Sequence, residues 1–253
     1  MNLTVDLNAD LGEGAGHDDE LFELISSANI ATGFHAGDAD TMHGAVSTAK
    51  ARGVAVGAHP SFFDRENFGR KEMRVSAEEV FDDVAYQLGI FQAIAAALGL
   101  QPNHVKPHGA LYNMATRDQK LADAIARATK SVDSKLILFA PDDTDLARAG
   151  AARGLQIARE VFADRNYLAS GALVPRTQSN ALLDDPEEAA ERVLRMLREG
   201  KVRSVDGIDV DVCAETVCVH GDTPEAVEFA RVLRSRLAKE GITIRAPRAF
   251  RKH

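Results

Sequence analysis

Short apolar runs alternate with longer amphipathic stretches along most of the chain. The runs predict β-strands, and the stretches in which apolar residues recur every three or four positions predict helices. The predicted strands span residues 3–10, 29–35, 54–59, 103–108, 135–140, 155–162 and 216–222. The predicted helices span residues 18–28, 39–53, 76–98, 117–130, 142–153, 184–200 and 224–241.

This alternation predicts an α/β fold in which helices cover a parallel sheet. Such a sheet either closes into a barrel or stays open and doubly wound, and we expect barrel-like closure. No segment rich in proline, glycine and serine is long enough to mark a boundary between domains. We therefore expect residues 1–253 to form a single (β/α)-barrel-like catalytic domain.

Composition narrows the classes of partner. The chain has 30 Lys and Arg against 38 Asp and Glu, a net charge of −8, which argues against nucleic acid as the main partner. Its 2 cysteines are too few for a disulfide framework. No apolar run approaches the roughly 20 residues of a membrane-spanning helix, and the acidic N-terminus does not resemble a signal sequence. We expect a cytoplasmic protein that does not bind membranes.

Four of the 8 histidines stand at or just after the end of a predicted strand, namely His35, His59, His108 and His220. In a parallel α/β fold the carboxyl ends of the strands gather at one edge, where active sites lie. A single histidine at such a place is as well explained by a structural hydrogen bond. Four in equivalent positions predict a shared site.

The first strand carries polar residues on one face. Asp6, Asn8 and Asp10 alternate with apolar residues, so a period of two places them on the same side. Buried carboxylates require an ion pair, hydrogen bonds, a metal or a catalytic role, whereas an edge strand with a solvated face is the structural alternative. Glu13 follows in a glycine-rich loop that does not match the dinucleotide fingerprint, and the chain has no phosphate-binding P-loop.

Further charged residues follow other predicted strands. Lys106 lies two residues before His108 and can stabilise an oxyanion while the imidazole moves a proton. Residues that can bind or pair with a charged substrate are Glu160, Asp164, Arg165 and Arg176. Either arginine can equally serve a structural ion pair, and Lys106 can be a surface charge.

Nucleophilic acyl-enzyme chemistry has little support in the sequence. There is no GxSxG motif, and neither Cys213 nor Cys218 is expected at a strand end beside a base. Carboxylates with histidines suit hydrolysis of an amide or ester by water, with or without a divalent metal. They also suit acid-base cleavage of a glycoside by two carboxylates.

Seven motifs together make the sequence specific. They are DLNADLGEG (6–14), NIATGFHAGD (29–38), GAHPSFFD (57–64), VKPHGALYN (105–113), EVFADRNY (160–167), LVPR (173–176) and VHGD (219–222). In this order and spacing, the chain resembles the LamB/YcsF family from Leu3 to about Ala246. The resemblance therefore covers nearly the whole sequence.

The resemblance implies a distorted (β/α) barrel related to the glycoside hydrolase/deacetylase superfamily. It also implies the activity of the A component of ATP-dependent 5-oxoprolinase, which acts with subunits B and C. The implied reaction cleaves the lactam of 5-oxo-L-proline to L-glutamate and hydrolyses ATP to ADP and phosphate. An unstrained lactam is a poor electrophile, so ring opening benefits from activation such as phosphorylation of the amide oxygen.

The family motifs contain the residues for which we expect site roles. Expected catalytic residues are Asp10, Glu13, His59, Lys106 and His108. Expected substrate contacts are Asp6, Asn8, His35, Glu160, Arg165, Arg176 and His220, and the motifs also contain Asp38, Asp164 and Asp222. Because related deacetylases hold a metal with one Asp and two His, the metal candidates are Asp10, His35 and His59.

The roles within this set remain open. The base for the attacking water is Asp10 or His108, Lys106 faces the oxyanion, and Arg165 or Arg176 binds the substrate carboxylate. A stand-alone metal-dependent deacetylase or amidohydrolase is the alternative enzyme. The non-enzyme alternative is a binding protein that presents a carboxylated small molecule to its partners.

Overall fold

A closed parallel barrel forms the centre of the protein. The computed structural model describes residues 3–220 and 226–249. Seven strands pair in parallel around the barrel, and the last pairs with the first. In order they are β1 (Thr4–Leu11), β2 (Ser27–Ala31), β3 (Ala55–His59), β4 (His104–Val105), β5 (Ile137–Ala140), β6 (Gln156–Phe162) and β9 (Thr216–Val219). The predicted closure is confirmed.

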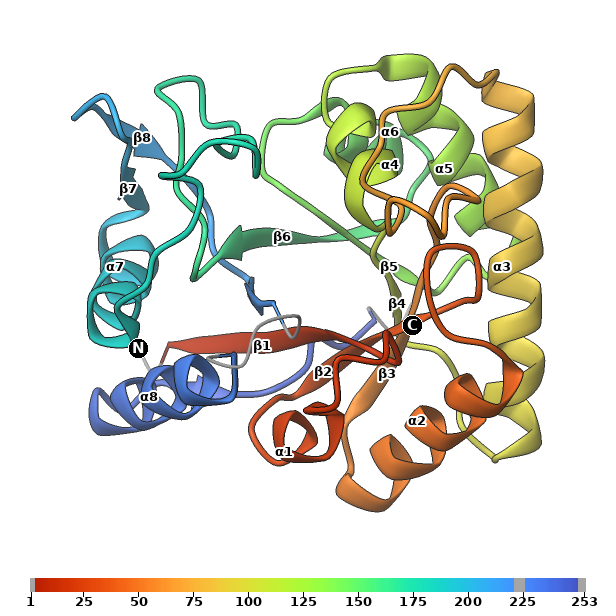
Figure 1. Ribbon diagram of the computed structural model, residues 1–253, viewed down its shortest axis with the longest axis horizontal. Helices are drawn as coiled ribbons and strands as arrows, with labels where there is room; N and C mark the ends of the chain where they lie inside the picture. The colour runs from red at the N-terminus through yellow and green to blue at the C-terminus, as the bar shows by residue number, and fades with distance from the viewer. Residues whose placement is uncertain (1–2, 221–225, 250–253) are drawn as a thin grey trace.

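Helices lie around the outside of the strands (Figure 1). They are α1 (Asp18–Phe22), α2 (Ala39–Arg52), α3 (Ala77–Ala97), α4 (Gly109–Ala115), α5 (Gln119–Val132), α6 (Asp145–Ala152), α7 (Pro186–Glu199) and α8 (Ala226–Lys239). Their apolar faces and the outer faces of the strands form the main hydrophobic core. The barrel interior is therefore left to the other face of each strand.

Local signals explain where the longer helices begin and end. Asp38 accepts a hydrogen bond from the backbone N–H of Thr41 at the start of α2, and Ser76 caps α3 in the same way. Helix α2 ends at Gly53, whose φ of +68° is the left-handed conformation that glycine adopts without strain. These signals are local, so the predicted bounds of both helices agree closely with the structure.

Some elements differ from the prediction because contacts between residues distant in sequence determine them. The helix predicted over 18–28 ends at Phe22, because Ser27 begins the fully buried strand β2. The sequence analysis also missed helix α4, the antiparallel hairpin of β7 (Lys201–Arg203) and β8 (Asp209–Asp211), and β10 (Thr243–Ile244), which pairs with the start of β1. Asp222, in the last family motif, lies outside the described residues.

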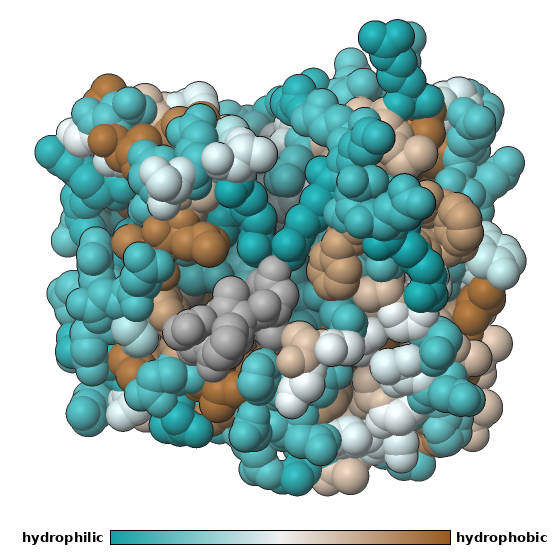
Figure 2. Space-filling view, viewed as in Figure 1, coloured by the Kyte–Doolittle hydropathy of each residue, from teal (hydrophilic) through white to brown (hydrophobic). Residues whose placement is uncertain are grey.

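Hydrophilic residues cover most of the face drawn in Figure 2 and border a hollow near its middle. None of the helices within residues 3–220 and 226–249 has the length and apolar character needed to cross a membrane.

Candidate functional site

The candidate site lies at the carboxyl ends of the strands. Glu13 follows β1, His35 follows β2, His59 is the last residue of β3, and Lys106 and His108 follow β4. The four cationic or imidazole side chains are at most 5% exposed, and the Glu13 side chain is 5% exposed. The structure thus brings together residues from four consecutive strand-helix units, as the predicted topology requires.

A buried ammonium forms one half of the site. Lys106 Nζ lies 2.9 Å from Asp10 Oδ1, 3.1 Å from Glu160 Oε1 and 2.9 Å from Cys218 Sγ. Burial alone would lower the pKa of Lys106, but the charge of Asp10 and its other neighbours raise it well above its ordinary value. Burial would raise the pKa of Asp10, but His59 and Lys106 hold it well below its usual range. Both groups are therefore charged at neutral pH.

Glu160 is fixed by neutral donors as well as by Lys106. Asn8 Nδ2 donates to Glu160 Oε1 at 3.1 Å, and the Tyr112 hydroxyl donates to Oε2 at 2.5 Å. Burial, together with the charge of Glu160, raises the pKa of Tyr112 well above its ordinary value. Tyr112 consequently remains a hydrogen-bond donor and Glu160 remains an acceptor.

Three histidines and Glu13 form the other half of the site. His59 Nδ1 lies 2.6 Å from the backbone O of Lys106, and His108 Nε2 lies 2.9 Å from Phe68 O. Because these carbonyls only accept, both ring nitrogens carry protons, and His59 Nε2 and His108 Nδ1 face each other at 3.0 Å.

Hydrogen bonds with Glu13 and Ser61 orient His35. Its Nε2 lies 2.8 Å from Glu13 Oε1, and because a carboxylate only accepts, Nε2 is the donor. The Nδ1 of the neutral ring then accepts from the Ser61 hydroxyl at 2.9 Å. One nitrogen of each ring and one carboxylate oxygen therefore converge at one point.

The protonation of these histidines follows from their neighbours. Burial lowers the pKa of His35, and burial with the charges of His35 and His59 lowers that of His108 well below its ordinary value. Burial would also lower the pKa of His59, but Asp10 and Glu13 raise it above its ordinary value. His59 is thus the histidine that holds a second proton, which lies between His108 Nδ1 and Asp10 Oδ2.

The donor atoms of the histidine cluster could also bind a divalent transition-metal ion. Donor atoms of Glu13, His35, His59 and His108 lie within 4.8 Å of one another. The other nitrogen of each imidazole lies within hydrogen-bond distance of an oxygen, the arrangement that orients histidine ligands in metal sites. Imidazole and carboxylate suit zinc and similar ions. Of the metal candidates, His35 and His59 belong to this cluster and Asp10 lies beside it.

The Lys106 ammonium already lies within a second group of possible metal ligands. This group consists of Asp10, Cys218 and His220. Lys106 Nζ lies 2.9 Å from both Asp10 Oδ1 and Cys218 Sγ, the position that a metal would take. The ammonium therefore fills this group.

Arginines border the site beside β6. Asp164 accepts a hydrogen bond from His220 Nδ1 at 2.9 Å, and its pKa is lowered because the charges of His220, Arg176 and Arg165 outweigh burial. Burial and the nearby charge of Arg176 lower the pKa of Arg165 to about 10. Arg165 donates to Val174 O at 2.6 Å, so it also holds the loop that carries Arg176.

The structure does not bring Asp6 to this site. Asp6 lies four residues before Asp10 in β1, about 13 Å deeper in the barrel at the rise of an extended strand. Hydroxyls of Ser26, Ser27 and Thr216 donate to it at 2.6, 2.8 and 2.6 Å. We therefore assign Asp6 to the barrel interior rather than to substrate binding.

Asn8 also supports the site from below. Its side chain donates to Thr216 Oγ1 at 2.7 Å and accepts from Asn29 Nδ2 at 2.7 Å. Asn29 Nδ2 lies 2.8 Å from Asp10 Oδ1 as well. Asn8 therefore holds Glu160 and the surrounding amides in place.

Cys218 lies close to the candidate site. Cys218 lies in β9, near the carboxyl end of the strand and beside Lys106, rather than away from the strand ends. Burial raises the pKa of its thiol well above the ordinary value despite Lys106, so the nucleophilic thiolate is disfavoured.

Sequence reasoning also missed three positioning residues, Tyr112, Ser61 and Gln87. Gln87 accepts from Ser61 N at 2.9 Å and from Thr32 Oγ1 at 2.8 Å, and thereby joins the loops after β2 and β3. A lone glutamine on the apolar face of the predicted helix 76–98 was a usable signal. The roles of Tyr112 and Ser61 depend on contacts distant in sequence, so no local signal identified them.

Comparison with known proteins agrees with this architecture. A "lactam utilization protein" from Thermus thermophilus is 50% identical, with a TM-score of 0.91 over 97% of this chain and 100% of that chain. A putative cellobiose-phosphate cleavage protein from Enterococcus faecalis is 13% identical, with a TM-score of 0.57 over 96% of this chain and 97% of its own.

A family 4 carbohydrate esterase from Streptomyces lividans is 14% identical, with a TM-score of 0.50 over 98% of this chain and 97% of its own. At such low identity, the esterase and the Enterococcus protein show the shared (β/α)-barrel fold alone. The model of the LamB/YcsF family matches residues 5–252. Because that match covers nearly the whole chain, the protein belongs to the LamB/YcsF family.

Proposed function

We propose that this protein opens the lactam ring of 5-oxo-L-proline to give L-glutamate. In the proposal it acts in the cytoplasm with 5-oxoprolinase subunits B and C, and the complex couples ring opening to ATP hydrolysis. Membership of the LamB/YcsF family and similarity to a protein named for lactam utilization support a hydrolase that acts on a lactam or amide. The observation that carries the proposal is the buried Lys106 ammonium beside a network of carboxylate and imidazole groups.

Each group has a task that matches its charge. Arg165 and Arg176 bind the substrate carboxylate, because a guanidinium can donate two parallel hydrogen bonds to it. Lys106 stabilises the negative charge that develops on the amide oxygen, and its burial keeps water from screening this interaction. Glu160 and Tyr112 hold the ammonium in position.

Neutral His108 is the better of the two bases for the attacking water. The Asp10 carboxylate is committed to the Lys106 ammonium at 2.9 Å, so protonating it would break a buried ion pair. His108 is neutral, and its Nδ1 carries the lone pair. Protonated His59 then gives its proton to the leaving amine, and the 3.0 Å contact between His59 Nε2 and His108 Nδ1 returns the proton gained from water.

In the proposal, a companion subunit binds and uses ATP. The chain has no phosphate-binding P-loop, so the proposal assigns the nucleotide to a companion subunit. A companion would phosphorylate the amide oxygen with ATP. Attack of water and cleavage of the C–N bond in this chain would then give an acyl phosphate, whose hydrolysis by a second water releases L-glutamate and phosphate.

The experiment is a glutamate-release assay with 5-oxo-L-proline, with and without ATP, for this chain alone and for the assembled complex. We expect ATP-dependent release by the complex only. His108→Ala should lower turnover by about 100-fold or more, whereas His43→Ala, on the exposed side of α2, should not. No glutamate from an assembled complex would refute the proposal, and unchanged turnover by His108→Ala would favour a protein that only binds substrate.

A second candidate function is a stand-alone metal-dependent amidohydrolase or deacetylase. The convergence of His35, His59, His108 and Glu13 favours it, and these residues would hold the metal. A divalent metal there would supply a Lewis acid that polarises the amide carbonyl. Asp10, at 3.4 Å from His59 Nε2, would then be the base. Stoichiometric metal in the purified protein, with ATP-independent turnover that a chelator abolishes, would support this function over the first.

A further inference from the structure

The 64–70 turn, which follows β3, packs against the histidine cluster. Two hydrogen bonds close it, from Gly69 N to Asp64 O at 2.7 Å and from Phe68 N to Arg65 O at 3.2 Å. The tip of the turn is exposed, whereas Gly69 is buried and Phe68 is partly buried. The turn therefore directs Phe68 and Gly69 inward, toward the site.

Phe68 has a backbone conformation that is unfavourable for its residue type. Its φ is +54°, in the left-handed region, where the Cβ of a bulky residue crowds the backbone. Gly69, with a φ of +63°, continues the reversal without strain because it has no Cβ. Strain of this kind persists only where surrounding contacts outweigh it, and it gathers at functional sites. The contacts of Phe68 should therefore show what its conformation achieves.

The first such contact is a hydrogen bond with His108. Nε2 of its imidazole lies 2.9 Å from Phe68 O, and because a carbonyl only accepts, Nε2 carries the proton. The next carbonyl, Gly69 O, accepts from Ala110 N at 2.9 Å, in the first turn of α4. The 64–70 turn thus holds both the His108 side chain and the backbone that follows it.

The second contact is made by the Phe68 ring. It lies edge-on to His35, with centroids 5.5 Å apart at 87°, and to His108, with centroids 5.4 Å apart at 82°. The two imidazoles are stacked on each other, with centroids 3.9 Å apart and planes inclined by 6°. The guanidinium carbon of Arg70 lies 5.0 Å from the centroid of the Phe68 ring. One ring thereby fixes the stacked pair, and its packing offsets the strain in its backbone.

The turn and the two histidines are packed with little room for movement. A Cβ on Gly69 would lie 2.9 Å from His35 Cβ and 3.0 Å from His108 Cδ2, both closer than ordinary van der Waals contact. The backbone of the turn therefore approaches both residues closely. A shift of the turn would move Phe68 O relative to His108 Nε2.

The neighbouring histidine shows why a side chain is needed here. His59 Nδ1 faces Lys106 O at 2.6 Å, and the backbone N–H of Lys106 donates to Ala58 O at 3.0 Å, next to the pairing of β3 with β4. The acceptor for His108 lies outside the barrel strands, in a turn. Its position depends on the packing of Phe68 rather than on strand pairing.

We propose that Phe68 is a positioning residue for His108: its left-handed backbone holds the carbonyl against Nε2, and its ring holds the stacked imidazoles of His35 and His108. The lone pair of His108 is thereby confined to Nδ1, which faces His59 Nε2 at 3.0 Å. The catalytic consequence rests on the proposed function, in which His108 is the base. The positioning itself does not, because the same lone pair would bind a metal in the second candidate function.

The test of positioning is the tautomer of His108, measured by ¹⁵N NMR of the full chain labelled in its histidines. Imidazole nitrogens with and without a proton have well-separated ¹⁵N shifts, and His108→Ala identifies the His108 signals by their absence. We expect one tautomer in wild type, protonated at Nε2, and a mixture of both tautomers in Phe68→Ala. Phe68→Gly should give the same mixture while melting at a temperature no lower than that of Phe68→Ala, because glycine relieves the backbone strain.

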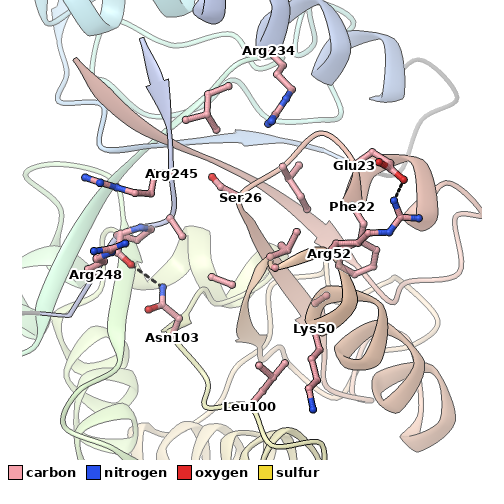
Figure 3. Close-up of a pocket in the computed structure, with 18 residues that line it drawn as sticks. Phe22, Glu23, Ser26, Lys50, Arg52, Leu100, Asn103, Arg234, Arg245 and Arg248 are labelled. Atoms are coloured by element: carbon pink, nitrogen blue, oxygen red, sulfur yellow. Dashed lines mark hydrogen bonds and ion pairs between the residues drawn. The ribbon is translucent and has the colours of Figure 1, made fainter. Parts of the chain in front are cut away.

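Two controls separate positioning from general loosening of the fold. Phe63→Ala removes a ring of the same loop that is 69% exposed and packs on Phe34. Leu100→Ala removes packing at the opposite end of the barrel, where Leu100 lines a cavity beside the starts of the strands (Figure 3). Both variants should keep the wild-type tautomer of His108.

The effect on catalysis is measured as glutamate release by the assembled complex. Phe68→Ala should lower kcat by about tenfold or more with little change in KM, because the base is misoriented while the groups that bind substrate are retained. Phe63→Ala should change neither parameter. If the wild-type complex releases no glutamate, the proposed function fails and the NMR comparison still decides the inference.

Three results would overturn the inference. The first is the wild-type tautomer of His108 in both Phe68 variants. The second is an equal change of tautomer in Phe63→Ala or Leu100→Ala, which would show general loosening. The third is a lower kcat with an unchanged tautomer, which would assign Phe68 a merely structural role.

Discussion

Asp6→Asn separates a structural role for Asp6 from the substrate contact that the family motif suggested. The carboxyl group is 1% exposed and accepts hydrogen bonds from three hydroxyl groups. Burial raises its pKa to about 6, although the bonds from Ser26, Thr216 and Ser27 oppose the shift. The folded protein therefore keeps a proton on Asp6 over a pH range in which the unfolded chain has lost it.

The sign and size of the effect follow from proton linkage. Between pH 3.8 and about 6 the folded state binds more protons than the unfolded state, so the free energy of unfolding falls as pH rises. The contribution is fully present below pH 3.8 and is lost as pH rises through about 6. The difference between these pKa values corresponds to about 3 kcal/mol. Asparagine does not titrate, so the variant lacks this dependence.

The assay is urea unfolding of wild type and Asp6→Asn at several pH values from about 4 to 7.5, which span the shifted titration. We expect the stability of the variant relative to wild type to increase by about 2.5 kcal/mol across this range. Asp38→Asn serves as a control with little pH dependence in this range, because hydrogen bonds from Thr41 lower the pKa of Asp38 and its contribution is lost only below pH 3.8. A constant difference between wild type and Asp6→Asn at every pH would refute the reasoning. A large rise in KM for Asp6→Asn with unchanged stability would instead support a role for Asp6 in substrate binding.

The remaining predictions concern the ammonium and the barrel interior. Lys106→Met should destabilise the protein by about 3–5 kcal/mol in urea unfolding, because it leaves the buried charge of Asp10 unpaired, and adding Asp10→Asn should recover part of the loss. Gly57→Ala should cost about 3 kcal/mol or more, because its Cβ would lie 2.2 Å from the His104 ring, whereas Gly44→Ala in open space on α2 should slightly stabilise the protein. Equal melting temperatures for the two alanine variants would contradict the packing argument.

Several features of the site could be predicted because their causes are local or topological. His35, His59 and His108 stand at strand ends, and parallel strands place such positions together. The alternation of Asp6, Asn8 and Asp10 correctly predicted a shared face, which the structure shows to be buried. The same alternation could not say how deep each residue lies, since period two assigns a face and not a height.

His104 illustrates the limit of judging residues by their place in the sequence. It precedes Lys106 and has no strand-end position, yet it lies in the barrel interior, 2.8 Å from Asn29 Oδ1 and stacked on Phe139. Burial lowers its pKa to about 3, so it is a neutral structural residue. Gly57 leaves the space for its ring, a match between two strands that no pattern along one strand reveals.

The sequence by itself determined the succession of strand-helix units, the caps of the longer helices and the strand ends that carry histidines. These features depend on the period of apolar positions and on backbone hydrogen bonds between near neighbours. Only the tertiary structure decided which ring nitrogens face one another and that Lys106 fills the group around Asp10. The physical reason is that charge, burial and hydrogen bonding act through space, between residues that barrel closure brings together.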